Sequence, residues 1–510
     1  MSRTLRFLTG YRMNLKEFLE HHGLRTNPFA EEDAQTDVVF REHCIDGTFH
    51  PAWDKVIGSP SAPSTSIVFG AKGSGKTAMR LQLDRNLRQY NADHPGQRVF
   101  VIHYDDFNGW IGQLQTRLGR RVAAKPERVL QQVGIHDHMD ALLVQGVTEL
   151  IDQVLQTTGS SSAVEHSVPR AEVDKLDKDQ RRDLLLLAAC YDQSKIGNTR
   201  ERWNELRRTL HVRAWWSQTD WVVAWVGSVV GALSALGLWW NEYLTLKYAI
   251  LFAIVAILIS SGRYLWRLAM CYSRAWKVVR NCRVRRQSVG EQTGVFLQLP
   301  WSAWSSEPMP VDRVSESRYS LLAKLQHILQ SLGFPGIIVL VDRVDEPELV
   351  NGKPELMRLL IWPMLDNKLL KHPRMGFKLM LPQELQHFVD RETREFHDRA
   401  RLDKQNVMSN FDWTGESMYD LVSARLAACA LPGRKPVPTD LFDVSIGQER
   451  LIKAMRDLRV PRQLFRFLYS VVSEHCKKYT SSEPEFKIQS ATFESVFATC
   501  QENFRRETLA

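Results

Sequence analysis

Two long stretches without a charged side chain lie in the middle of this 510-residue chain. Residues 221–240 form twenty consecutive uncharged positions, and residues 248–262 form a second uncharged run. A helix of about 20 residues spans about 30 Å, which is the thickness of the hydrocarbon core of a bilayer. Tryptophans crowd the ends of both runs, where amphipathic rings settle among lipid headgroups. The sequence therefore predicts a two-helix transmembrane hairpin over residues 216–266.

The distribution of charge predicts how this hairpin is oriented. Residues 200–220 carry five arginines against three acids, and residues 263–286 carry eight Arg or Lys and no acid. Basic flanks stay on the cytoplasmic side, so we expect two spans in an inner or plasma membrane, with both termini in the cytoplasm. The formal charge of +9 is then explained by these flanks, and nucleic acid is not indicated as a partner.

Small residues recur at a spacing of four in the first run, at Gly227, Gly231 and Ala235. Such spacing lets helices approach closely, either within the hairpin or against a second copy of the chain. The alternative to a membrane hairpin is a helical hairpin buried in a large soluble core, although core helices rarely reach this length without a charge.

The chain as a whole has a globular composition, with 44% apolar and 25% charged residues. Its seven cysteines include no CxxC pair, which excludes a zinc ribbon or a disulfide framework and fits a reducing compartment. No apolar stretch near the start is long enough for a secretory signal, and the true start is either Met1 or Met13.

Upstream of the hairpin, a glycine-rich loop predicts phosphate binding. Residues 66–69 form a short apolar run typical of a strand, and the following GxxxxGKT sequence leads into a helical pattern. Glycines let the backbone wrap around phosphate oxygens, and the helix adds its positive N-terminal end. We expect Lys76 to contact the β- and γ-phosphates of a nucleotide and Thr77 to bind Mg²⁺. The nucleotide-binding residues of this P-loop are Gly70, Ala71, Lys72, Gly73, Ser74, Gly75, Lys76 and Thr77.

A second motif, downstream of the hairpin, supplies carboxylates. Residues 336–341 are a continuously aliphatic run that is typical of a buried parallel strand, and Asp342 follows directly. We expect Asp342 to hold magnesium through water, and Asp345 or Glu346 to orient the attacking water. The two motifs together predict an ATP hydrolase with ATP and Mg²⁺ as cofactors.

This pair of motifs resembles the AAA-related and STAND/KAP groups of P-loop ATPases, within the ASCE division. Their first and second motifs are the Walker A and Walker B motifs. KAP-type ATPases carry transmembrane helices between the two. Here Lys76 and Asp342 are 266 positions apart (342 − 76), and the uncharged runs lie between them.

Three further segments extend the resemblance. Residues 23–29 are similar to the GL…NPF segment that lies beside the nucleotide base in related ATPases. Asp412-Trp413 and the helical pattern over 416–429 resemble the first helix of a C-terminal lid. Residues 460–466 resemble the sensor-2 motif, which implies that Arg462 reaches the γ-phosphate.

Other positions depart from the family pattern. KAP proteins usually carry DDxDR at Walker B, whereas this chain has Arg343 after Asp342, nearer the STAND form. The sensor-1 position offers Pro382-Gln383 after a strand over 377–381, in place of Asn or Thr. Four arginines come after this position and alternate with acidic residues. They either belong to a solvated helix face, or one of them is an arginine finger. They are Arg391, Arg394, Arg399 and Arg401.

The predicted fold class is α/β: a doubly wound parallel sheet of the P-loop NTPase type, with an all-helical C-terminal lid, a helical insertion and the transmembrane hairpin. Strands are expected at 66–69, 98–104, 336–341 and 377–381. The predicted segments of the chain are an N-terminal entry segment (1–60), a first ATPase core segment with Walker A (61–105), a helical insertion (106–215), the hairpin (216–266), a juxtamembrane return segment (267–330), a second ATPase core segment with Walker B and sensor 1 (331–415) and the lid with sensor 2 (416–510).

Three functions fit these features. The first is a membrane-anchored ATPase that acts as a nucleotide-driven switch or assembly module, as in prokaryotic conflict and antiviral defence systems, and forms a homo-oligomer. The second is an AAA-type motor or secretion-associated ATPase that remodels cargo at the membrane. The third is a membrane scaffold that binds nucleotide without hydrolysing it. GTP is disfavoured because no NKxD motif occurs: Asn367-Lys368 continues as Leu-Leu.

Overall fold

The computed structural model describes most of the chain, in two compact units. The described residues are 12–155, 168–193, 199–212, 215–241, 243, 245–299 and 307–509. Unit 1 comprises Met1–His94, Leu340–Asp345 and Leu370–Ala510, and unit 2 comprises Pro95–Val339 and Glu346–Leu369.

Five parallel strands form one sheet in the order β2-β3-β4-β1-β5. The strands are β1 (Ser66–Gly70), β2 (Val99–Tyr104), β3 (Gly336–Val341), β4 (Met375–Pro382) and β5 (Asn406–Met408). Every residue of β1, β3 and β4 is buried, because helices cover both faces of such a sheet and leave only the strand ends to solvent. The predicted α/β class with a parallel sheet is confirmed, and β5 is a strand that the sequence did not predict.

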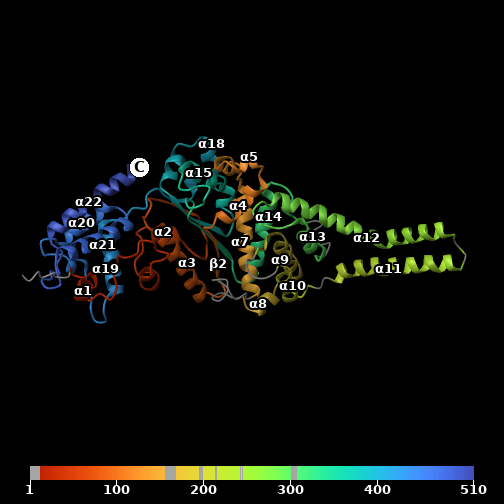
Figure 1. The fold of residues 1–510 in the computed structure, drawn as a ribbon, viewed down its shortest axis with the longest axis horizontal. Helices are drawn as coiled ribbons and strands as arrows, with labels where there is room; N and C mark the ends of the chain where they lie inside the picture. The colour runs from red at the N-terminus through yellow and green to blue at the C-terminus, as the bar shows by residue number, and fades with distance from the viewer. Residues whose placement is uncertain are drawn as a thin grey trace, which may run out of the picture. The chain divides into compact units, whose positions relative to one another are not determined.

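Unit 1 also contains a helical region with its own core. Helices α19, α20, α21 and α22 lie together (Figure 1), and their apolar side chains bury Phe18, Leu24 and Phe29 from the N-terminal segment. The predicted helix over 416–429 forms as α19, and α21 begins at Pro461, which suits a first helical turn. The helices of unit 1 are α1 (Leu15–His21), α2 (Trp53–Ile57), α3 (Lys76–Asp93), α17 (Glu384–Asp390), α18 (Arg394–Ala400), α19 (Gly415–Cys429), α20 (Gln448–Leu458), α21 (Pro461–Lys478) and α22 (Ser490–Leu509), with short turns at Phe40–Cys44, Leu402–Lys404 and Pro438–Leu441.

Unit 2 is mainly helical, as expected for residues 106–215. Its longest buried helix is α7, and buried ion pairs tie this helix to its neighbours. Three parts of the predicted helical insertion lie outside the described residues, at 156–167, 194–198 and 213–214. The helices are α4 (Asn108–Arg117), α5 (Arg120–Ala123), α6 (Pro126–Leu130), α7 (Ile135–Leu155), α8 (Arg170–Asp174), α9 (Lys178–Tyr191), α10 (Thr199–Thr209), α11 (Trp215–Trp240), α12 (Leu246–Asn281), α13 (Val289–Leu297), α14 (Ser315–Ser331), α15 (Pro354–Ile361) and α16 (Asn367–Leu370), with a 3-10 turn at Trp362–Met364.

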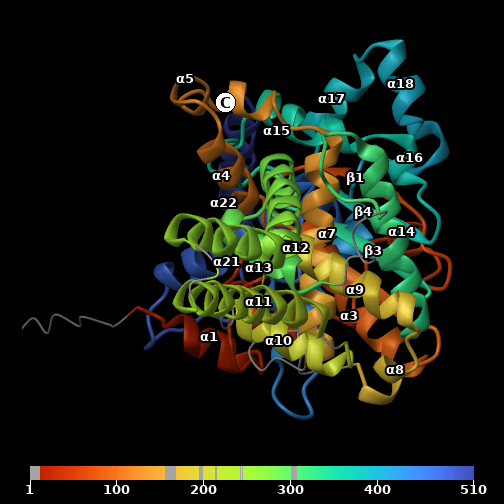
Figure 2. The same ribbon diagram turned by 90° about the vertical axis from the view of Figure 1, so that its right-hand side faces the viewer.

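Helices α11 and α12 run side by side in both views (Figures 1 and 2) and are long and apolar enough to cross a membrane. Only 17% and 6% of their most apolar windows are buried, and large side chains such as Trp225 and Leu258 are exposed. Such exposure argues against the alternative of a hairpin buried in a soluble core. Helix α12 continues to Asn281, so the second helix extends past the predicted end of the hairpin at residue 266.

The small residues of the first apolar run pack within the hairpin. A Cβ atom on Gly227 would lie 2.5 Å from the Cβ of Ser260, and one on Gly231 would lie 2.6 Å from the Cβ of Ala256. Helix α12 therefore occupies the face that the sequence left open to a second copy of the chain. The hydroxyl of Ser228 adds contacts to Ser260 across the same interface.

Candidate functional site

The glycine-rich loop joins β1 to α3 in unit 1. Gly73 and Gly75 have φ angles of +83° and +96°, which L side chains rarely adopt. A Cβ atom on Gly73 would also lie 2.7 Å from the Cβ of Arg462, so this position has no room for a side chain. The two glycines thus fix the loop conformation that brings the chain from the strand end into the start of α3.

The side chain of Lys76 folds back over this loop. Its Nζ donates hydrogen bonds to the carbonyls of Gly70 and Ala71, at 2.6 and 3.0 Å. Burial lowers the pKa of Lys76, and the carboxylates of Asp342 and Asp345 partly oppose this shift. An ammonium that bonds only to neutral carbonyls can exchange these bonds for bonds to an anion.

Asp342 lies at the carboxyl end of β3, beside the start of α3. Its side chain is buried and accepts a hydrogen bond from the hydroxyl of Thr77. Burial raises the pKa of Asp342, while Arg80 is the strongest influence in the opposite direction. The structure thus brings together Thr77 and Asp342, the two predicted magnesium ligands, although the two motifs are 266 residues apart (342 − 76).

Asp345 and Glu346 follow in the turn after β3. Asp345 is half-buried and close enough to Lys76 to oppose the lowering of its pKa. Glu346 is exposed. Of these two carboxylates, Asp345 is therefore the one whose charge acts on the lysine of the glycine-rich loop.

Arg462, the predicted sensor-2 arginine, lies against the loop. Its backbone N–H donates to the carbonyl of Gly73 at 3.3 Å, and its positive charge helps to lower the pKa of Lys76. Arg462 lies there because α21 begins beside the loop, with Pro461 in its first turn.

Two features of the site escaped the sequence prediction. Arg80, one turn after Thr77 on α3, is buried, and its Nε lies 3.3 Å from Oδ2 of Asp342. The spacing of three residues from Thr77 was a signal, because such positions share a helix face. The backbone N–H of Gln383, at the predicted sensor-1 position, donates to the carbonyl of Gly70 at 3.1 Å.

An aromatic cluster borders the loop and was also missed. Trp413 Nε1 donates to the carbonyl of Ser74 at 2.8 Å, and the ring of His50 stacks on Phe411 with centroids 3.7 Å apart. The backbone N–H of Ala52 donates to Nδ1 of His50, so Nε2 carries the proton and donates to the carbonyl of Asp412. Burial lowers the pKa of His50 to about 4, and the ring is therefore neutral at pH 7.

Other predicted residues have local partners. Leu24 and Phe29 of the 23–29 segment lie in the core of the C-terminal helices, and the carbonyl of Pro28 accepts a hydrogen bond from Arg425. Among the four finger candidates, Arg394 is 95% exposed beside Asp398, and Arg401 is near Asp403. Arg399 lies over the ring of Phe396, and Arg391 caps the end of α17.

Comparisons with protein families, with characterised proteins and with solved structures found no match to this chain. Its function must therefore be inferred from its own residues and their geometry.

Proposed function

We propose that the chain is a membrane-anchored P-loop ATPase of the KAP/STAND/AAA-related kind, which binds and hydrolyses Mg-ATP as a nucleotide-driven switch. The observation that carries this proposal is the convergence of Lys76, Thr77, Asp342 and Arg462 on one glycine-rich loop between a parallel strand and a helix. A strand, a glycine-rich loop and a helix N-terminus together form an anion-binding arrangement.

The donor set near Asp342 fits a magnesium ion. A carboxylate and a hydroxyl are oxygen ligands that Mg²⁺ prefers. Oδ2 of Asp342 lies 3.3 Å from Nε of Arg80 and accepts no hydrogen bond from any described residue. Thr77 and Asp342 would hold the ion, which neutralises phosphate charge when it is bound. Lys76 would turn from its two carbonyls to the β- and γ-phosphates, and Arg462 would approach the γ-phosphate from α21.

Hydrolysis further requires a carboxylate that orients water. Asp345 is the better supported candidate, because its charge acts on Lys76, and Glu346 is the next residue in the same turn. We expect Asp345→Asn or Glu346→Gln to retain ATP binding while turnover falls by about 100-fold or more, since orientation of the nucleophile contributes that much to phosphoryl transfer.

Phosphate release by the detergent-solubilised protein tests this assignment, with Arg85→Ala, an exposed position further along α3, as the matched control. Turnover that is unchanged in both carboxylate variants would remove the hydrolase assignment and favour the non-hydrolysing membrane scaffold.

Membrane anchoring is the second claim of the proposal, with α11 and α12 as the two spans and both termini in the cytoplasm. Its support is the exposure of the apolar side chains of both helices, together with the basic flanks. Tyr243→Cys, between the two helices, should react with a membrane-impermeant thiol reagent in intact cells, whereas Ser288→Cys should not. Labelling of Ser288→Cys alone, or recovery of the protein in the soluble fraction, would contradict this topology.

The proposed switch would form a homo-oligomer when it binds ATP. An exposed arginine such as Arg394 would then be accessible to a neighbouring copy of the chain. The main alternative is a motor that remodels cargo at the membrane. Mass photometry of Glu346→Gln with and without ATP separates the two, because a switch predicts assembly that depends on ATP alone, without cargo.

A further inference from the structure

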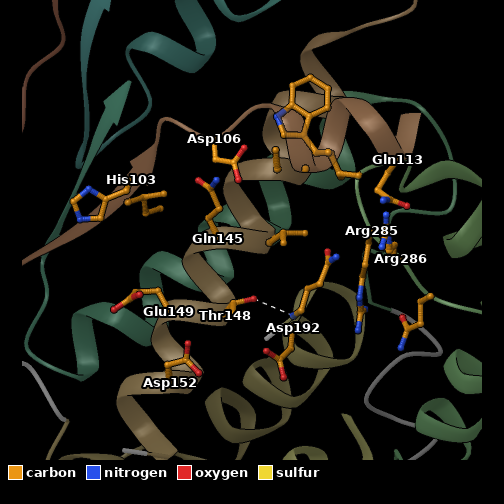
Figure 3. A pocket seen from close by; sticks show the side chains of 18 of the residues that line it. His103, Asp106, Gln113, Gln145, Thr148, Glu149, Asp152, Asp192, Arg285 and Arg286 are labelled. Atoms are coloured by element: carbon orange, nitrogen blue, oxygen red, sulfur yellow. Dashed lines mark hydrogen bonds between the residues drawn. The ribbon is translucent and has the colours of Figure 1, made fainter. Parts of the chain in front are cut away.

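Unit 2 contains a cavity of about 730 Å³ that no step of ATP hydrolysis uses. It lies between β2, α4 and α7 on one side and residues 284–287, which follow α12, on the other (Figure 3). Cavities of about 300–1,000 Å³ accommodate typical small-molecule ligands.

One side of the cavity is cationic. Arg285 is 6% exposed, and its Nη1 donates to the carbonyl of Ala189 at 2.7 Å, but none of the described carboxylates lies within ion-pair distance of it. Burial lowers the pKa of Arg285, as expected for a guanidinium without a paired acid. Arg286 beside it is exposed, and both polar atoms of the Gln287 amide are buried without a hydrogen-bond partner among the described residues. A buried arginine and an unsatisfied amide are costly unless a ligand completes their bonds.

The opposite side carries carboxylates. Figure 3 shows Glu149 and Asp152 on α7 across the cavity from Arg285 and Arg286. Asp152 and Asp192 share the single guanidinium of Arg202, so this pairing offsets only part of the negative charge on that side of the cavity. Oε1 of Gln145, further along the same wall, accepts no hydrogen bond from a described residue. This side offers acceptors for hydroxyl and amino groups.

We propose that this cavity binds a nucleoside monophosphate, with the phosphate at Arg285 and Arg286 and the ribose or base at Glu149 and Gln145. Arginine binds phosphate through paired N–H donors, and carboxylates hydrogen-bond ribose hydroxyls in nucleotide sites. Two arginines on one side match a single phosphate group, and the volume accommodates one nucleoside. Because residues 284–287 continue directly from α12, the ligand would connect the end of the hairpin helix to the edge strand β2, as an effector distinct from ATP.

The experiment measures binding of AMP, GMP, CMP and UMP by calorimetry to the full chain carrying Lys76→Ala, which disables the glycine-rich loop. We expect at least one monophosphate to bind, with the matching nucleoside and inorganic phosphate each binding more weakly than the intact nucleotide. Arg286→Gln should weaken binding by about 10- to 100-fold, as for loss of a hydrogen bond to a charged group. Glu149→Gln should weaken it less.

Arg280→Gln, an exposed arginine on α12 outside the cavity, is the matched control and should bind normally. If Arg285→Gln fails to fold, Arg286→Gln still decides the question, because Arg286 is exposed. Absence of binding for all four monophosphates, or binding that neither Arg286→Gln nor Glu149→Gln weakens, would overturn the proposal. Neither result bears on ATP binding at Lys76.

Discussion

Buried charges are compensated differently among the ion pairs around α7 in unit 2 and at the glycine-rich loop of unit 1. In the interior of unit 2, Arg318 is fully buried and donates two hydrogen bonds of 3.1 Å to Asp140, and Arg202 is held between Asp152 and Asp192. At the glycine-rich loop of unit 1, the hydrogen-bond partners of the Lys76 ammonium among the described residues are two neutral backbone carbonyls.

This difference separates charges that hold the fold from charges that await a ligand. A guanidinium that is matched to a carboxylate has little to gain from a new partner, and loss of either group leaves an uncompensated buried charge. An ammonium held by carbonyls gains bonds when an anion arrives. We therefore expect mutations of the paired arginines Arg318 and Arg202 to affect stability and mutations at the loop to affect binding.

The largest expected effect is on the stability of unit 2. Arg318→Met should lower the free energy of unfolding by about 3–5 kcal/mol, because Asp140 would be left buried without its partner. Thermal or urea unfolding measures this, and Arg313→Met, at an exposed arginine nearby, should change stability by less than about 0.5 kcal/mol. Equal stability of the two variants would break the comparison.

Arg80 combines the two kinds of buried charge, because it is paired with a carboxylate and also lies within the candidate nucleotide site. Arg80→Met should cost about 1–3 kcal/mol without nucleotide, since Asp342 would lose its nearest positive charge. Added Mg-ATP should raise the melting temperature of this variant more than that of the wild type, because magnesium would neutralise the same carboxylate. A smaller rise than in the wild type would contradict magnesium binding at Asp342.

The smallest effect concerns a buried lysine in unit 1 that is unrelated to the loop. Lys378 on β4 is 1% exposed and donates to the carbonyls of Ile57 and Ser64, and burial lowers its pKa to about 8. The unfolded chain keeps this proton up to about pH 10.4, so between these values the unfolded state binds more protons and folding becomes more favourable as pH rises.

We expect the stability of the wild type relative to Lys378→Met to increase by about 1 kcal/mol per pH unit from pH 8 to 10, and to be constant below pH 7. Unfolding at several pH values checks this. A difference that shrinks as the pH rises would show that Lys378 is stabilised as a cation, like the arginines of unit 2.

The sequence predicted those parts of the fold whose structure is determined by residues close together along the chain. The aliphatic runs of β1 and β3, the glycine-rich loop and the two apolar helices each show within a short window. Strand β5 escaped because it has only three residues and a polar start. The sequence could not predict which helix packs against Gly227 and Gly231, because the four-residue spacing fits a helix of the same hairpin and a helix of a second copy equally well.

Contacts between distant segments could not be predicted in the same way. Arg283 and Asp137 are 146 positions apart, and the contact of His50 with Phe411 joins the N-terminal segment to the residues that follow β5. Arg80 shares a helix face with Thr77, yet its carboxylate partner is known only once β3 is placed beside α3.

The central claim is that the glycine-rich loop binds ATP through Lys76. Equilibrium binding of ATP to the full chain in detergent, with magnesium, tests it directly for the wild type, Lys76→Ala and Arg85→Ala. We expect Lys76→Ala to lose ATP affinity by at least about 100-fold with an unchanged melting temperature, whereas Arg85→Ala should bind ATP as the wild type does. Equal ATP affinity in all three proteins would contradict the claim.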